Sequence, residues 1–173
     1  TWGTYLIRIQ PIYDKGRIDS ITCLTSTGTI IPLLASTYNL INNTFGRYNV
    51  AIGLNTLYGN TTGNFNTGLG TGALQLNTIG DKNTAVGYVA LQQNTLGARN
   101  NAFGYKSLFL NTTGGYNSAF GTYSLRSNTV GVKNSCFGEN TLTNNTTGSN
   151  NSAFGYGALV NNTIGNNNTA VGQ

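Results

Sequence analysis

The sequence has no histidine and no methionine, and it contains very few acidic residues. Only Asp14, Asp19, Asp81 and Glu139 are acidic among its 173 residues. Without histidine, acid–base catalysis and metal binding by imidazole are excluded. The acidic residues are too scattered for the carboxylate pair of a glycosidase, and a calcium-binding β-roll would need an aspartate in every coil. We therefore expect no enzyme activity, no cofactor and no metal site.

Charge, cysteine and long apolar runs are also scarce. Charged residues make up 8% of the chain, against roughly 25% in an average soluble domain. The nine basic residues give a net charge of +5 but are scattered, so we expect no nucleic-acid binding. The two cysteines, Cys23 and Cys136, lie far apart in sequence, and they do not by themselves imply a disulfide.

No apolar run is long enough to cross a bilayer, so we expect no direct membrane insertion of this segment. The chain starts at Thr1 without methionine and its last residues fall inside a repeat. We therefore expect a fragment of a longer polypeptide, or a processed one.

The sequence does contain a strict repeat. One unit runs over 100–116, the next begins at 117, and seven complete units of this length fill 49–167 without an insertion. A fixed period of this length indicates a repeat architecture, and the strict spacing argues against the disorder that a glycine-rich composition would suggest. A unit begins at each of Asn49, Asn66, Asn83, Asn100, Asn117, Asn134, Asn151 and Asn168.

Several positions within the unit, counted from its first asparagine, keep one residue type. Positions three and eight are small, position four is large and apolar, position five is glycine and position nine is leucine; Asn-Thr-x-Gly occupies positions 12 to 15. We expect the large apolar residues to form the core: Leu57, Leu74, Leu91, Leu108, Leu125, Leu142, Leu159, Phe103, Phe120, Phe137 and Phe154. We expect the corners at glycines and asparagines that include Gly87, Gly104, Gly121, Asn94, Asn111 and Asn128.

These residues predict an all-β chain. Asn-Thr-x-Gly suits a type I turn, and the glycine at position five suits a second corner with positive φ or close backbone approach. Between the corners we expect two extended runs of about five residues. Stacked units, roughly 4.8 Å apart, then form a parallel β-solenoid or β-roll, in which columns of asparagine build hydrogen-bonded ladders.

The chain divides at residue 37. In 1–37 we expect a β-rich element, with strands within 4–9, 16–25 and 29–31, that caps the solenoid or links it to another domain. In 38–173 we expect the solenoid: a degenerate half-coil that includes Leu40 and Asn43, seven full coils and the start of an eighth.

The solenoid core predicted in this way is thin. Two large apolar side chains per coil contribute less than the ordering of a whole coil costs in conformational entropy. Small residues at positions three and eight leave room for a close contact with a neighbouring chain. The sequence therefore predicts a parallel homotrimer.

Two segments carry a resemblance to known proteins. Asn-Thr-Ala-Val-Gly-Tyr at 83–88 and Asn-Ser-Ala-Phe-Gly-Tyr at 151–156 resemble the head repeats of trimeric autotransporter adhesins and related repeats of phage and large-virus fibre proteins. The resemblance covers about 38–173, although this unit is longer by a Tyr-x-Ala-Leu segment. It implies a trimer of β-rolls forming a stiff, extracellular fibre on a cell or virion surface.

Two variable positions are candidates for a ligand surface. Position 17 mixes basic and aromatic residues, and position six carries several tyrosines, so that these columns can bind a cell-surface glycan or receptor. A solvated corner is the simpler interpretation, and the sequence favours it. An alternative function of another class is a single-chain ice-binding solenoid that uses its Asn-Thr arrays. The candidate ligand residues are Lys82, Arg99, Tyr116, Lys133, Tyr88, Tyr105 and Tyr156.

Overall fold

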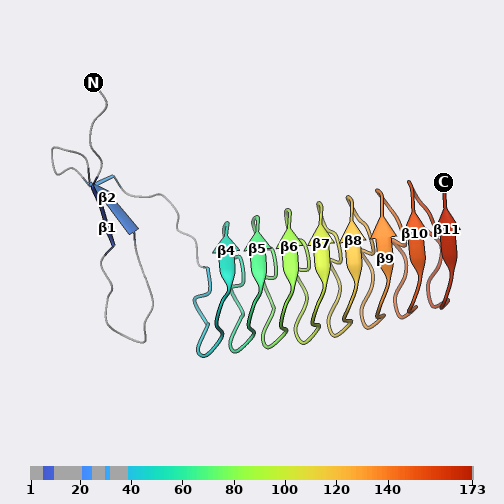
Figure 1. Ribbon diagram of the computed structural model, residues 1–173, viewed down its shortest axis with the longest axis horizontal. Coiled ribbons are helices and arrows are strands. Elements are labelled where there is room, and N and C mark those ends of the chain that lie inside the picture. The colour runs from blue at the N-terminus through green and yellow to red at the C-terminus, as the bar shows by residue number, and fades with distance from the viewer. Residues whose placement is uncertain (1–5, 10–20, 25–29, 32–38, 173) are drawn as a thin grey trace, which may run out of the picture. The chain divides into compact units, whose positions relative to one another are not determined.

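The computed structural model describes residues 6–9, 21–24, 30–31 and 39–172, and the chain divides into two units, Thr1–Ser36 and Thr37–Gln173. In the first unit, β1 (Leu6–Ile9), β2 (Ile21–Leu24) and β3 (Ile30–Ile31) form an antiparallel sheet in the order β1-β2-β3 (Figure 1). Each strand lies inside a segment for which the sequence predicts one. The other residues of those segments lie outside the described ones, and the capping role stays a prediction.

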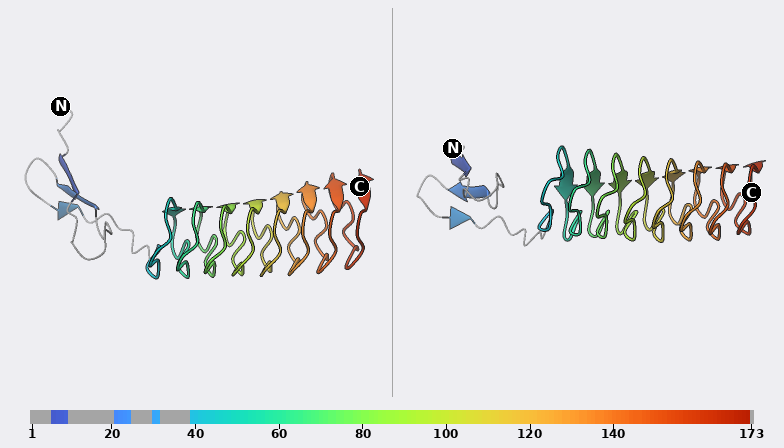
Figure 2. Two further views of the ribbon diagram at one scale, coloured as in Figure 1. Left: turned by 60° about the horizontal axis from the view of Figure 1, so that its bottom comes forward. Right: turned by 90° about the horizontal axis from the view of Figure 1, so that it is seen from below.

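The second unit is a parallel β-solenoid whose coils stack side by side along one axis (Figures 1 and 2). Each strand pairs with the next in register, so that Ala102 faces Ala119, its equivalent one repeat later. The predicted fold and period are thus confirmed. The three-residue strands are β4 (Val50–Ile52), β5 (Thr67–Leu69), β6 (Thr84–Val86), β7 (Asn101–Phe103), β8 (Ser118–Phe120), β9 (Ser135–Phe137), β10 (Ser152–Phe154) and β11 (Thr169–Val171).

The second extended run that the sequence predicts is absent from the described coils, and successive turns replace it. In one coil, Ala73 N donates to Gly70 O (3.2 Å), Gln75 N to Gly72 O (3.3 Å) and Asn77 N to Leu74 O (3.1 Å). The residues at positions five, seven and nine have positive φ, including Leu74 at 52°. Leucine rarely adopts this conformation, and for that reason the leucine column gave no sign of a turn in the sequence.

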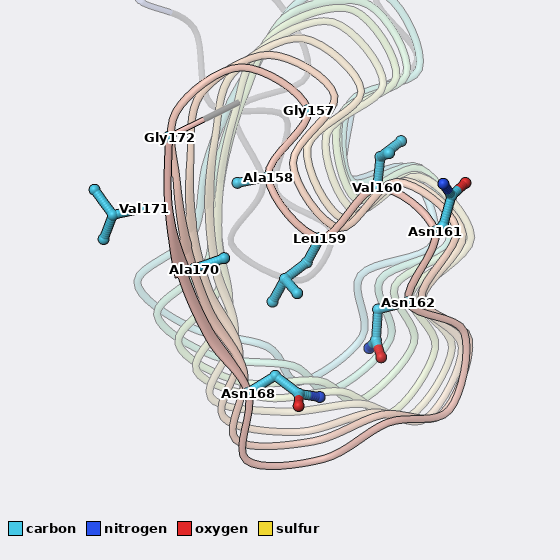
Figure 3. A pocket seen from close by; sticks show the side chains of 10 residues that line it. All are labelled: Gly157, Ala158, Leu159, Val160, Asn161, Asn162, Asn168, Ala170, Val171 and Gly172. Carbon is cyan, nitrogen blue, oxygen red and sulfur yellow. The ribbon is translucent and has the colours of Figure 1, made fainter.

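The interior of each coil contains the leucine of position nine together with small residues. Leu108, Ala102 and Ala119 are fully buried, and in the last coil Ala158, Leu159 and Ala170 point inward (Figure 3). The small positions three and eight therefore fill the coil itself, and the expectation that they contact a neighbouring chain was wrong. The coil is so narrow that a small residue must lie opposite each leucine.

The expectation that the phenylalanines at position four belong to the core also needs correction. Phe137 and Phe154 are each 40% exposed, while Phe103 and Phe120 are half-buried. Successive side chains of a strand point to opposite faces. Because position three points inward in every coil, positions two and four must point outward.

Two ladders of buried asparagine hold the coils together, as predicted. Asn111 Nδ2, at position 12, donates to Asn94 Oδ1 (2.8 Å) and to Gly114 O (2.9 Å). In the ladder of position one, the backbone N–H of Asn117 donates to Asn100 Oδ1 (3.0 Å). The buried amides of both ladders are thus paired, as buried polar groups must be.

The Asn-Thr-x-Gly corner differs from the predicted type I turn in its hydrogen bonds. The backbone N–H groups of Thr112, Thr113 and Gly114 all donate to Thr129 O of the next coil, at 2.9, 3.2 and 3.3 Å. The backbone N–H groups of the corner thus bond to the neighbouring coil, and the bond within the turn is donated by the asparagine side chain, from Asn111 Nδ2 to Gly114 O. At the other corner, Gly104 has φ +134°, and a Cβ there would lie 2.6 Å from the carbonyl of Gly121.

We predict that Leu108→Ala lowers the free energy of unfolding by about 2–5 kcal/mol, because it removes a fully buried side chain and leaves a cavity. Leu110→Ala is the matched control, since Leu110 lies in the same coil and is 36% exposed; it should cost clearly less. Denaturant unfolding followed by circular dichroism measures both. Equal losses would contradict the inward direction of position nine.

We also predict that Asn111→Asp destabilises the solenoid by about 1–3 kcal/mol or more at pH 7, because the carboxylate loses two donated hydrogen bonds and buries a charge. At pH 3 the protonated carboxyl can donate one bond, so the loss relative to wild type should shrink. Asn144→Asp, on an exposed residue, should cost little at either pH. An equal loss at both pH values would contradict the ladder.

Candidate functional site

The structure separates the two columns that the sequence proposed as a ligand surface. Position 17 precedes each strand and position six follows it; Arg99 and Tyr105, for example, lie on either side of β7. Lys82, Arg99, Tyr116 and Lys133 are all exposed. The two columns therefore form two stripes with a strand between them rather than one surface.

One close pair forms in the position 17 stripe. Arg99 Nη1 donates to Tyr116 Oη (3.0 Å), and the guanidinium lies 5.1 Å from the centre of the Tyr116 ring. Lys82 and Lys133 lie in neighbouring coils on either side of this pair. The stripe is basic, with its side chains open to solvent along four coils.

In the position six stripe, two of the three candidate tyrosines come together. Tyr88 and Tyr105 stack with ring centres 5.6 Å apart and planes 9° apart. Tyr156 lies three coils further along, and Thr122 and Glu139 occupy the coils between. The tyrosines are 52%, 39% and 57% exposed in chain order.

Sequence reasoning missed a group of residues next to Tyr105. The side chains of Tyr105, Lys106, Phe109, Tyr123 and Arg126 make a continuous series of contacts, and we call them the aromatic–cation cluster. Lys106 Nζ lies 5.3 Å from the ring centre of Tyr105 and 5.7 Å from that of Phe109. Tyr105 packs edge-on against Tyr123 at 5.3 Å, and Arg126 Cζ lies 5.7 Å from the centre of the Tyr123 ring.

The cluster occupies positions six, seven and ten of two successive coils. Two kinds of turn bring the side chains of the cluster together. In one, the N–H of position eight donates to the C=O of position five, and in the other, the N–H of position ten donates to the C=O of position seven. The only signal in the sequence is that units 100–116 and 117–133 carry an aromatic and a basic residue at positions seven and ten. Without the turns, nothing indicated that these residues were neighbours.

Neither acidic side chain of 39–172 forms its hydrogen bonds with Lys106 or Arg126, the two cations of the cluster. Asp81 accepts a hydrogen bond from the Asn64 backbone (2.6 Å), and Glu139 accepts one from Asn140 (3.5 Å). These are the two acidic residues of 39–172. Arg126 Nε is buried and has no hydrogen-bond partner among the residues that the structure describes.

Residues at positions seven and ten of the first coils line a pocket. This cavity of about 320 Å³ is lined by Ile41, Asn55, Tyr58 and Gln75. A second cavity, of about 480 Å³, is the uncovered end of the last coil (Figure 3). Because its lining is the interior that every coil shares, we assign it no separate chemistry.

The threonines at position 13, from Thr61 to Thr146, donate their hydroxyl protons to the next coil. Thr112 Oγ1 donates to Thr129 O (3.1 Å), and Thr129 Oγ1 donates to Thr146 O (3.1 Å). The same bond recurs along the column. In an ice-binding surface built on this array, the hydroxyl protons would already be donated to carbonyl groups of the next coil.

Among the described residues, no three His, Cys, Asp or Glu side chains gather as a metal site. The same residues contain no helix with the length and apolar character needed to span a bilayer. Comparisons of the chain with protein-family models, curated proteins and solved structures gave no significant match.

The thiol of Cys136 is fully buried at position three, and burial raises its pKa to about 12. The thiolate is the reactive form, so we predict slow alkylation by iodoacetamide in the folded protein. A Cys23→Ser variant isolates this thiol for mass spectrometry. At both pH 7 and pH 9, labelling should be far slower in the folded state than in denaturant, where the pKa returns to its ordinary value. Equal rates in both states would contradict the burial.

Proposed function

We propose that residues 38–173 are a structural segment of a surface fibre, in which three parallel copies of the solenoid pack along a common axis. The fibre belongs to a trimeric adhesin or to a virion or phage tail fibre, and it is extracellular, on a cell or virion surface. Residues of its outer face then bind a host-surface glycan or receptor.

The observation that supports this proposal is the outward row of apolar side chains at position four. Ile52 is 59% exposed, Leu69 45%, and Phe137 and Phe154 40% each. The row runs through all eight strands, which is about 34 Å for seven spacings of roughly 4.8 Å. Apolar surface that is continuous over such a length is typical of a protein–protein contact.

A second copy of this chain matches the row better than an unrelated surface would. The phenylalanine rings stack at 4.8, 4.8 and 5.2 Å between centres, almost parallel. A parallel copy repeats the same spacing, so equivalent residues meet at every level. Small polar residues at position two, such as Ser118 and Ser135, let the backbones approach. The number three comes from the resemblance to trimeric adhesin repeats.

The ice-binding alternative has less support. Its threonine array donates its hydroxyl protons to the next coil, and large aromatic side chains interrupt the outer face of the sheet. Thermal hysteresis of the isolated chain tests it directly.

We predict that the chain at micromolar concentration has three times the mass of a monomer in multi-angle light scattering. Phe120→Asp places a charge in the apolar row and should give monomers whose circular dichroism is unchanged. Val130→Asp is the control, because Val130 is 47% exposed at position 14, outside the row; it should remain a trimer. A folded wild-type monomer would overturn the proposal.

A further inference from the structure

We propose that the aromatic–cation cluster is a binding site for an anionic carbohydrate, namely a pyranose that bears a carboxylate or sulfate group. The inference deepens the proposed surface-fibre function and rests on it for access to external glycans. The site itself lies within one chain.

The cluster combines aromatic surface with two separate positive charges. Lys106 lies between the rings of Tyr105 and Phe109, and Arg126 lies over Tyr123. All but Tyr105, which is 39% exposed, are half-buried. Partly desolvated cations attract an anion more strongly than solvated ones do, because the local dielectric constant is lower.

The coil does not need these side chains for its own structure. At position seven, where Lys106 and Tyr123 have φ of 53° and 56°, other coils have Gly72 and Gly157. Lys106 and Tyr123 thus occupy left-handed backbone positions that glycine adopts more readily. At position ten, where Phe109 and Arg126 lie, later coils have Thr143 and Val160. The fold is the same in all of them, so the coil itself does not require these four residues.

The chemistry of the cluster indicates the class of ligand. A sugar ring has an apolar face that packs on aromatic side chains, and a few placed polar groups fix its orientation, as in other small-molecule sites. The guanidinium of Arg126 can pair with a carboxylate or sulfate through two parallel hydrogen bonds. Its Nε–H is buried and has no partner within the described part of the chain, so an anion would pair with the two terminal Nη groups of the guanidinium.

The site also stays accessible in the proposed fibre. Position ten and position four point to opposite sides of the coil, as Val160 and Val171 show in the last one (Figure 3). Packing of three copies through position four therefore leaves position ten, with Phe109 and Arg126, facing outward.

Isothermal titration calorimetry with three hexasaccharides tests the proposal: a heparin-derived hexasaccharide, hexagalacturonic acid and neutral maltohexaose. We expect at least one acidic probe to bind at least 10-fold more tightly than maltohexaose. Binding of hexagalacturonic acid assigns the anion as carboxylate, whereas binding of the heparin probe alone assigns it as sulfate. If neither acidic probe binds, the proposal is overturned.

Charge-matched variants locate the site. Arg126→Gln and Lys106→Gln should each weaken the affinity at least 5-fold, whereas Arg99→Gln, which removes the same charge from the position 17 stripe, should change it less than 2-fold. Equal losses in all three would indicate diffuse charge attraction and overturn the site. Circular dichroism checks the fold of each variant, and two cluster variants are tested so that unfolding of one still leaves a result.

The same samples separate this inference from the trimer. If the wild-type chain is a monomer in light scattering and still binds the acidic probe, only the assembly is wrong. If it is a trimer and no acidic probe binds, only the carbohydrate site is wrong.

Discussion

The ladder of asparagines at position 12 is the interaction on which the solenoid depends. Each buried amide has two acceptors, one in its own coil and one in the preceding coil, as Asn94 shows with Gly97 and Asn77. Leaving such a group unpaired costs about 1–3 kcal/mol. One added or lost residue would move the next amide away from its partner and impose that cost in both ladders. The fixed length of the repeat follows from this constraint.

Backbone hydrogen bonds and burial explain how the coil tolerates strained backbone at position nine. Leu108 has φ 51°, a conformation that costs a non-glycine residue about 1–2 kcal/mol. Its N–H donates to Ser124 O (3.0 Å) and its C=O accepts from Asn111 N (3.1 Å), while its side chain is fully buried. Bonds within and between coils thus stabilise the turn that points each leucine inward.

The sequence was enough to predict the period, the parallel in-register stacking and the asparagine ladders, because each follows from a residue type repeated at fixed spacing. It was not enough to orient position four. Ala119 and Phe120 alternate in a three-residue strand, and either could face inward by pattern alone. Large apolar residues are usually buried, so hydrophobicity favoured the wrong face. The aromatic–cation cluster could not be predicted either. Turns bring Tyr105 and Tyr123 together, and the leucines in these turns are residues that do not indicate a turn in the sequence.

The periodicity of a surface feature indicates the kind of partner that it suits. The apolar row of position four recurs in every coil although the interior does not require it, so we infer a partner with the same repeat, most simply another copy of the chain. The cluster from Tyr105 to Arg126 occupies only two coils and departs from the residues found elsewhere at its positions. A feature limited to two coils, roughly 5 Å apart, has the dimensions of a sugar residue rather than of a fibre. Repeated and local features of the same solenoid thus suit different ligands.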